Sequence, residues 1–156
     1  MSDLTVRPAT PADAAVLASL AERLGACPLP SWRTPGDIAN ADGRAMLDAV
    51  AAGSDQNEVM IAERRGEVVG CLHVLATTDF FGLRHAHVSV LATTAAAEGT
   101  GVARALMAHA EAWTVKRGLP LLTLNVFDRN ARARRFYEQS GFEMEMVKYA
   151  KRVPGE

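Results

Sequence analysis

The stretch TTAAAEGTGVAR, residues 93–104, decides the fold of this chain. It follows an alternating segment, residues 85–93, that predicts a β-strand. It leads directly into residues 102–117, whose apolar spacing predicts a helix. Gly99 and Gly101 allow the backbone to turn tightly and to point successive N–H groups outward. Because the first N–H groups of a helix are unpaired and carry partial positive charge, this loop suits a diphosphate group.

Two familiar kinds of phosphate loop do not fit the stretch. A Walker loop ends in Gly-Lys-Ser or Gly-Lys-Thr, and neither is present. A dinucleotide-binding GxGxxG loop requires glycine at the position of Arg104, and it opens a long doubly wound sheet. Only about 50 residues follow Arg104, so both alternatives are excluded.

The segments on either side of the loop predict a mixed sheet. Residues 121–127 form a buried-looking strand after the helix, and a strand–helix–strand passage implies one parallel pair. Upstream, residues 58–63 and 67–76 alternate around a turn at Arg65-Gly66, which predicts an antiparallel hairpin.

The remaining elements lie toward the two ends of the chain. They are a strand over residues 4–6, a helix capped by Thr10 and ended by Gly25, an irregular segment over 26–35, a helix over 37–52 interrupted near Asp42-Gly43, a helix over 130–139 closed by Gly141, and a final strand over 142–151. The expected order is βααβββαβαβ. This order predicts an α/β (α+β) fold with a mostly antiparallel sheet, one parallel pair, and helices on both faces.

Composition bounds the classes of protein to which the chain can belong. Its 156 residues predict one domain, residues 1–156. A net charge of −1 excludes a globally basic nucleic-acid binder. No apolar run approaches the ~20 residues of a membrane span, and Asp3 and Arg7 interrupt any export signal. Cys27 and Cys71 are far apart, so we expect no disulfide, no metal site and a cytoplasmic location.

Two motifs resemble those of the GCN5-related N-acetyltransferases. Glu98-x-x-Gly101-x-Ala103 resembles motif A, usually Q/R-x-x-G-x-G/A, and the segment from Asn130 to Phe142 resembles motif B. Residues 5–13 also look like the common N-terminal opening of the family. Glu98 departs from the usual Gln or Arg, and its carboxylate should weaken the binding of a diphosphate somewhat. We expect Arg104 to compensate for this loss of cofactor affinity.

The resemblance implies the GNAT fold, with a parallel strand pair that splays apart. It also implies an acetyl-CoA-dependent enzyme that acetylates a primary amine of a small molecule or peptide by direct attack in a ternary complex. Pantetheine would lie along Leu91 to Thr93, where the Leu91 N–H would polarise the acyl carbonyl. The implied cofactor-binding residues are Leu91, Ala92, Thr93, Glu98, Gly99, Thr100, Gly101, Val102, Ala103, Arg104, Asn130, Ala133 and Phe136.

Transfer to an amine needs a base, because a primary amine with a pKa of about 10 is protonated at neutral pH. His87 matches the family's base position, and histidine titrates in the required range. His85, His73 and a water chain are the alternatives. Tyr137 matches the family's general acid, which would protonate the leaving thiolate.

Several further points remain open from sequence. A non-catalytic acyl-CoA sensor or assembly module would carry the same fold, and the acyl donor could be longer than acetyl. The four arginines 129, 132, 134 and 135 form a solvated helix face or reach the cofactor's 3′-phosphate. We expect the acceptor site to be shaped by residues 25–43 and 77–84. A homodimer through the C-terminal strands is also expected, because the family often pairs in this way.

Overall fold

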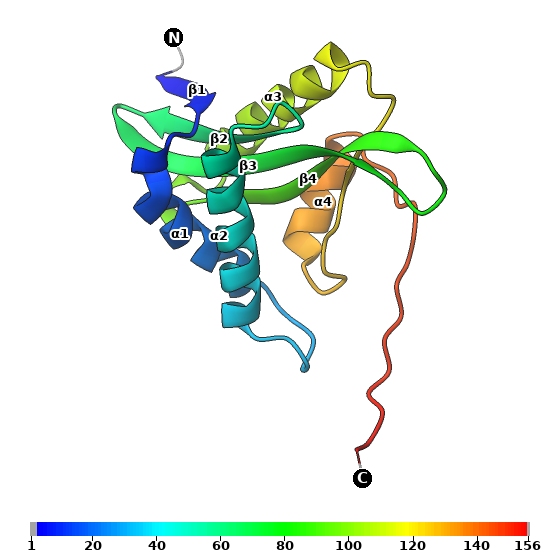
Figure 1. The fold of residues 1–156 in the computed structure, drawn as a ribbon. Helices are drawn as coiled ribbons and strands as arrows, with labels where there is room; N and C mark the ends of the chain where they lie inside the picture. The colour runs from blue at the N-terminus through cyan, green and yellow to red at the C-terminus, as the bar shows by residue number, and fades with distance from the viewer. Residues whose placement is uncertain (1–2, 156) are drawn as a thin grey trace.

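The computed structural model describes residues 3–155, which build a five-stranded sheet in the order β1-β2-β3-β4-β5 (Figure 1). The first four strands pair antiparallel, and β4 and β5 pair parallel, which confirms the predicted mixed sheet. The strands are β1 (Leu4–Pro8), β2 (Asn57–Arg64), β3 (Glu67–Thr78), β4 (Arg84–Thr93) and β5 (Leu122–Leu124).

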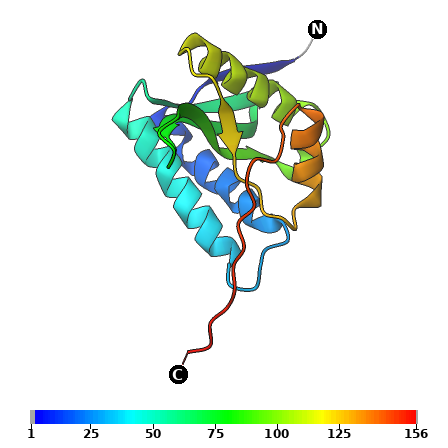
Figure 2. The ribbon, with the colours of Figure 1, turned by 90° about the vertical axis from the view of Figure 1, so that its right-hand side faces the viewer.

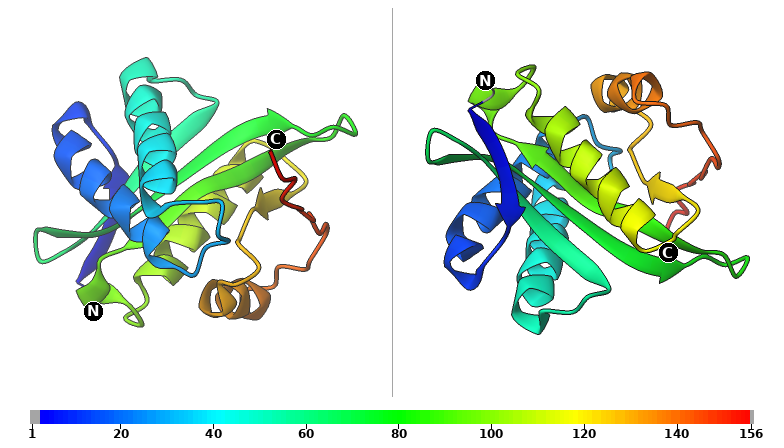
Figure 3. Two further views of the ribbon diagram at one scale, coloured as in Figure 1. Left: turned by 90° about the horizontal axis from the view of Figure 1, so that it is seen from below. Right: turned by 90° about the horizontal axis from the view of Figure 1, so that it is seen from above.

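Helices cover both faces of the sheet, as predicted. Figure 3 shows α1 and α2 together on one face and α3 across the other. The α-helices are α1 (Ala14–Glu22), α2 (Pro35–Ala52), α3 (Val102–Lys116) and α4 (Ala131–Gln139), and the 3₁₀ turns are η1 (Pro11–Asp13), η2 (Arg23–Ala26) and η3 (Ala95–Ala97). None of the helices in residues 3–155 combines the length and apolar character that a membrane crossing requires.

A bulge in β4 sets the geometry of the sheet. His73 lies opposite Val90 while Val74 lies opposite Val88, so Ser89 is an extra residue in β4. Consequently Ala86 and Val88 pack in the core under α3, whereas Val90 and Ala92 pack in the core under α1 and α2. The strand therefore changes the face on which its even-numbered residues lie.

The parallel pair separates at this bulge. β5 pairs with β4 only at Ala86, His87 and Val88, and β4 then continues to Thr93. Residues 89–93 thus have a free edge on the β5 side in the described part of the chain. This separation agrees with the predicted splayed pair, although β5 is shorter than the predicted strand 121–127.

The helix that follows the glycine loop lies close to the sheet at Gly70. A Cβ at this position would lie 2.8 Å from Val102 Cγ1 and 2.9 Å from the carbonyl oxygen of Ala92. Both distances are shorter than real Cβ contacts, so glycine is required where the start of α3 crosses β3.

The predicted break in the second helix is wrong. α2 runs unbroken from Pro35 to Ala52. It begins with a capping box in which Thr34 Oγ1 accepts from the N–H of Asp37 at 3.2 Å, and the Thr34 N–H donates to Asp37 Oδ2 at 2.9 Å. Gly43 is buried, and a Cβ there would lie 3.5 Å from Ala21 Cβ, so this glycine allows α1 and α2 to pack closely rather than interrupting the helix.

The predicted final strand, residues 142–151, is also wrong. This segment has no helix or strand, and it leaves the body of the molecule toward the C-terminus (Figures 1 and 2). Met144, Met146 and Tyr149 are 65%, 68% and 92% exposed. A strand exists only when its backbone pairs with a sheet edge, and no described part of the chain offers these residues a partner. Near its end, Arg152 Nη2 donates to the carbonyl oxygen of Ser31 at 3.3 Å.

Gly70→Ala should lower the free energy of unfolding by about 1–3 kcal/mol, because the added methyl group overpacks the contact between α3 and β3. Urea unfolding measures the effect. Gly36→Ala is the matched control, since its Cβ would meet only Thr34 Oγ1 at 3.9 Å within the first turn of α2. Equal stability of the two variants would contradict the close approach of α3 to β3.

Candidate functional site

The glycine loop at the start of α3 is held by side-chain hydrogen bonds. Gly99 and Gly101 have φ values of 72° and 90°, in the left-handed region that favours glycine. Thr100 Oγ1 donates to the carbonyl oxygen of Ala97 at 2.6 Å, and Arg64 donates to Thr100 Oγ1 at 2.9 Å and to its carbonyl oxygen at 3.1 Å. A Cβ at Gly99 or Gly101 would meet no atom within 4 Å, so the loop faces open space.

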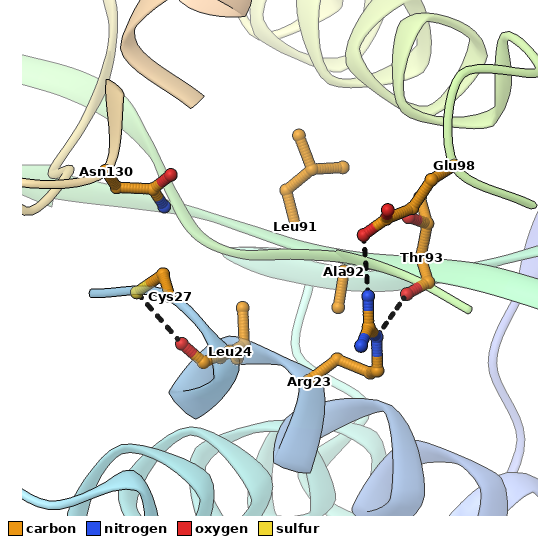
Figure 4. A pocket seen from close by; sticks show the side chains of 8 residues that line it. All are labelled: Arg23, Leu24, Cys27, Leu91, Ala92, Thr93, Glu98 and Asn130. Carbon is orange, nitrogen blue, oxygen red and sulfur yellow. Dashed lines mark hydrogen bonds and ion pairs between the residues drawn. The ribbon is translucent and has the colours of Figure 1, made fainter. Parts of the chain in front are cut away.

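A cavity of about 160 Å³ lies beside the free edge of β4 (Figure 4). It is bounded by the end of β4, by the turn η2, by Glu98 before the glycine loop, and by the residue that precedes α4. Its lining residues are Arg23, Leu24, Cys27, Leu91, Ala92, Thr93, Glu98 and Asn130. Five of them were predicted from sequence, and the structure brings these five together from three separate segments.

Sequence reasoning missed the three residues of the lining that come from η2 and the residue after it. Arg23, Leu24 and Cys27 enter the site because η2 lies against the end of β4: Arg23 Nε donates to the carbonyl oxygen of Thr93 at 3.3 Å. No spacing in the sequence links these positions to the glycine loop. A basic residue directly after the end of α1 is the sole local signal.

Glu98 is held between two arginines. Its Oε1 lies 2.6 Å from Arg23 Nη2, and its Oε2 lies 2.6 Å from Arg132 Nη1. The Arg132 hydrogen bond holds the pKa of the Glu98 carboxyl below its usual value. These two arginines compensate the charge of Glu98 in the free protein. Compensation by Arg104 for weaker cofactor binding stays a prediction.

Three histidines lie close together on the strands next to the cavity. His87 is half-buried, with Nδ1 2.8 Å from Thr123 Oγ1 on β5. Burial and the neighbouring His85 lower the pKa of His87 below its usual value. His73 and His85 are 5% and 6% exposed. His87 is therefore the most accessible of the three.

The two buried histidines differ in their surroundings. His85 Nδ1 lies 3.0 Å from the carbonyl oxygen of Leu83. Neither ring nitrogen of His73 has a hydrogen-bond partner in residues 3–155, and burial lowers the pKa of its ring. Both rings are enclosed, so His87 is the candidate base with the most exposed ring in this arrangement.

Tyr137 lies in an aromatic group on α4. Its ring centroid is 5.4 Å from that of Phe136 and 5.8 Å from that of Phe142, and it packs against the core under α3. Burial raises the pKa of the Tyr137 phenol, so the hydroxyl keeps its proton at neutral pH. Neither Tyr137 nor His87 is among the residues that line the cavity.

Asn130 both caps a helix and lines the cavity. Its Oδ1 accepts from the N–H of Ala133 at 3.3 Å, which makes it the cap of α4. Of the four arginines expected on this helix face, Arg132 binds Glu98 and Arg134 binds Asp128 at 2.8 Å.

The cysteines are free thiols with different exposures. Cys71 is fully buried, and burial raises the pKa of its thiol to about 12. Such a thiol is not a nucleophile. No group of three or more His, Cys, Asp or Glu residues within 3–155 is arranged to hold a metal ion.

Comparisons with known proteins match this chain to acetyltransferases. The model of the acetyltransferase (GNAT) family matches residues 17–142. The Bacillus subtilis protein YhfO, described as an uncharacterized N-acetyltransferase, is 26% identical, and the match covers 97% of this chain and 99% of that protein.

Solved structures share the fold at low identity. The PaiA N-acetyltransferase of Thermoplasma acidophilum, solved with coenzyme A, has a TM-score of 0.79 at 16% identity, covering 95% of this chain and 94% of that one. A protein of Bacillus halodurans C-125 described as a transcriptional regulator has a TM-score of 0.72 at 24% identity, covering 96% and 99%.

Proposed function

Because the chain belongs to the acetyltransferase (GNAT) family and is an N-acetyltransferase, we propose that it binds acetyl-CoA and acetylates a primary amine of a small molecule or peptide. The proposed route is direct attack of the amine in a ternary complex. The observation that carries the proposal is the cavity at the free edge of β4, which lies next to the glycine loop and the N-terminus of α3.

The residues at this cavity fit the parts of coenzyme A. The open loop over Gly99 to Arg104 offers backbone N–H groups and the positive end of a helix dipole to the diphosphate. The edge of β4 at Leu91 to Thr93 has no strand partner on the β5 side and offers backbone groups to the amides of pantetheine, although the Thr93 carbonyl oxygen already accepts from Arg23. Asn130 lines the same cavity. When bound, acetyl-CoA supplies an activated acyl thioester.

Gly101→Val should raise the acetyl-CoA dissociation constant at least tenfold, because a β-branched residue at φ 90° forces the loop to change its backbone. Isothermal titration calorimetry measures this constant directly. Gly53→Val, at φ 59° in the C-cap of α2, is the matched control for strain, and its affinity should equal that of the parent. Parental affinity in Gly101→Val would remove the loop from the cofactor site.

We assign the removal of the amine proton to His87. It is half-buried, it is more accessible than His73 and His85, and Thr123 Oγ1 fixes the position of its ring. A base must be neutral to accept a proton. The lowered pKa of His87 keeps the ring neutral at and above neutral pH, so the ring can accept the amine proton in that pH range.

kcat/KM should rise with pH through a value below histidine's usual ~6.5, because burial lowers the pKa of His87. His87→Gln should remove this rise and lower kcat/KM by about 10²–10⁴-fold. His109→Gln, an exposed histidine on α3, is the control and should keep the parental profile. An unchanged pH profile in His87→Gln would transfer the role to His85, His73 or water.

Tyr137→Phe should lower kcat by about 10²-fold or more, because the phenylalanine keeps the aromatic packing and loses the proton that Tyr137 holds for the leaving sulfur. The acetyl-CoA dissociation constant should stay nearly unchanged. Tyr149→Phe, in the exposed C-terminal segment, should have parental kinetics. A fully active Tyr137→Phe would show that the thiolate departs without this acid.

The alternative function is a non-catalytic acyl-CoA sensor. A sensor would carry the same fold and would bind the same cofactor, so only turnover distinguishes it from an enzyme. A mass-spectrometric screen of amines with acetyl-CoA and longer acyl-CoA donors separates the two, since a sensor binds without turnover.

We also keep the proposal of a cytoplasmic location, which the free thiols of Cys27 and Cys71 support.

We further propose a homodimer that uses the C-terminal segment. Apolar side chains at Met144, Met146 and Tyr149 are exposed on a single chain, and β5 is an edge strand. Sedimentation at micromolar concentration should give twice the 16.7 kDa of one chain, and deletion of residues 143–155 should give a single chain. A monomeric full-length protein would contradict the proposal.

A further inference from the structure

One carboxylate connects two arginines beside the candidate cofactor cavity, whose lining includes Glu98 and Arg23. Glu98 gives one oxygen to Arg23 and the other to Arg132, each at 2.6 Å. Arg23 belongs to η2 on one side, and Arg132 lies in the first turn of α4 on the other. Figure 4 shows the Glu98 carboxylate and the Arg23 guanidinium meeting over the end of β4.

The position of this carboxylate conflicts with the loop beside it. Glu98 directly precedes the glycines that aim N–H groups and the positive end of α3 at an anion. A bound diphosphate would therefore be repelled by Glu98 and attracted by both arginines. In the structure, Glu98 lies between the two guanidinium groups and pairs with both.

We infer that Arg23 and Arg132 form an anion-binding pair for the diphosphate of the cofactor, and that Glu98 is a built-in ligand that the diphosphate displaces. The inference rests on the proposed binding of coenzyme A. It adds a residue outside both sequence motifs, Arg23, and gives the carboxylate at position 98 a definite role as an intramolecular competitor.

The geometry makes the exchange feasible. The side chains of Arg23 and Glu98 are each 35% exposed and that of Arg132 is 69% exposed, so solvent screens both ion pairs and each is readily broken. A diphosphate carries more charge and more acceptor oxygens than a carboxylate, and it can bind both guanidinium groups at once. Removal of the competing carboxylate should therefore tighten cofactor binding by about threefold to tenfold.

The ion pair between Glu98 and Arg132 also attaches α4 to the glycine loop in the free protein. No residue of α4 is fully buried, and Arg132 is its contact with Glu98 at the N-terminal end. Without the carboxylate, the first turn of α4 loses this attachment. The amides of residues 131–139 should then exchange faster with deuterium in the absence of any ligand.

Calorimetry with coenzyme A tests the competition. Glu98→Gln keeps the shape of the side chain and removes its charge, and its dissociation constant should be about threefold to tenfold lower than that of the parent. Glu111→Gln, an exposed carboxylate on α3 with the same charge change, should bind like the parent. Unchanged or weaker binding by Glu98→Gln overturns the inference.

A double-mutant cycle with Arg132→Gln identifies the exchange itself. In the parent, loss of Arg132 removes both its contact with the diphosphate and its competing contact with Glu98, so the affinity should fall by a small factor. In the Glu98→Gln background the same substitution should weaken binding about threefold to tenfold more. Additive effects of the two substitutions would show that Arg132 does not pass from Glu98 to the cofactor.

Two further comparisons distinguish a failure of this inference from a failure of the proposed function. 3′-Dephospho-coenzyme A should show the same tightening in Glu98→Gln, and loss of the effect would move the arginine pair to the 3′-phosphate and overturn the diphosphate assignment. If the parent does not bind coenzyme A at all, the proposed function fails. If the parent binds it and Glu98→Gln does not bind it more tightly, the function stands and this inference fails.

Discussion

The bulge at Ser89 is the constraint on which the rest of the site depends. One extra residue in β4 changes the face of every residue after it, so Val88 packs under α3 and Val90 packs under α1 and α2. The same point ends the pairing with β5 and leaves residues 89–93 with a free edge. A regular parallel pair would bury those backbone groups, and neither the cavity nor its open edge would exist.

The second constraint is the placement of α3. Gly70 lets the first turn of this helix lie against β3, and Arg64 ties Thr100 to the sheet. The helix dipole and its first N–H groups are therefore aimed along the same edge that the bulge exposes. Two separate packing features thus shape the proposed anion site, and a change at either position should disturb it without touching a site residue.

The helix α4 is attached more loosely than the other parts of the site. α4 has no fully buried residue, and half-buried Tyr137, together with Phe142 just beyond the helix, joins it to the core under α3. At its N-terminal end the contact with Glu98 is electrostatic and exposed. The helix that carries the proposed acid is therefore held by a few contacts, and a ligand that takes over Arg132 can change how firmly it is held.

The sequence by itself determined the features that depend on near neighbours. The glycine loop, the start of α3, the hairpin at Arg65-Gly66 and the Asn130 cap were predictable, because each rests on residues a few positions apart. The tertiary structure alone decided the rest. Arg23 meets Glu98 across 75 positions, the bulge at Ser89 has no local signal, and residues 142–151 are not a strand because strand formation needs an edge that local sequence cannot supply.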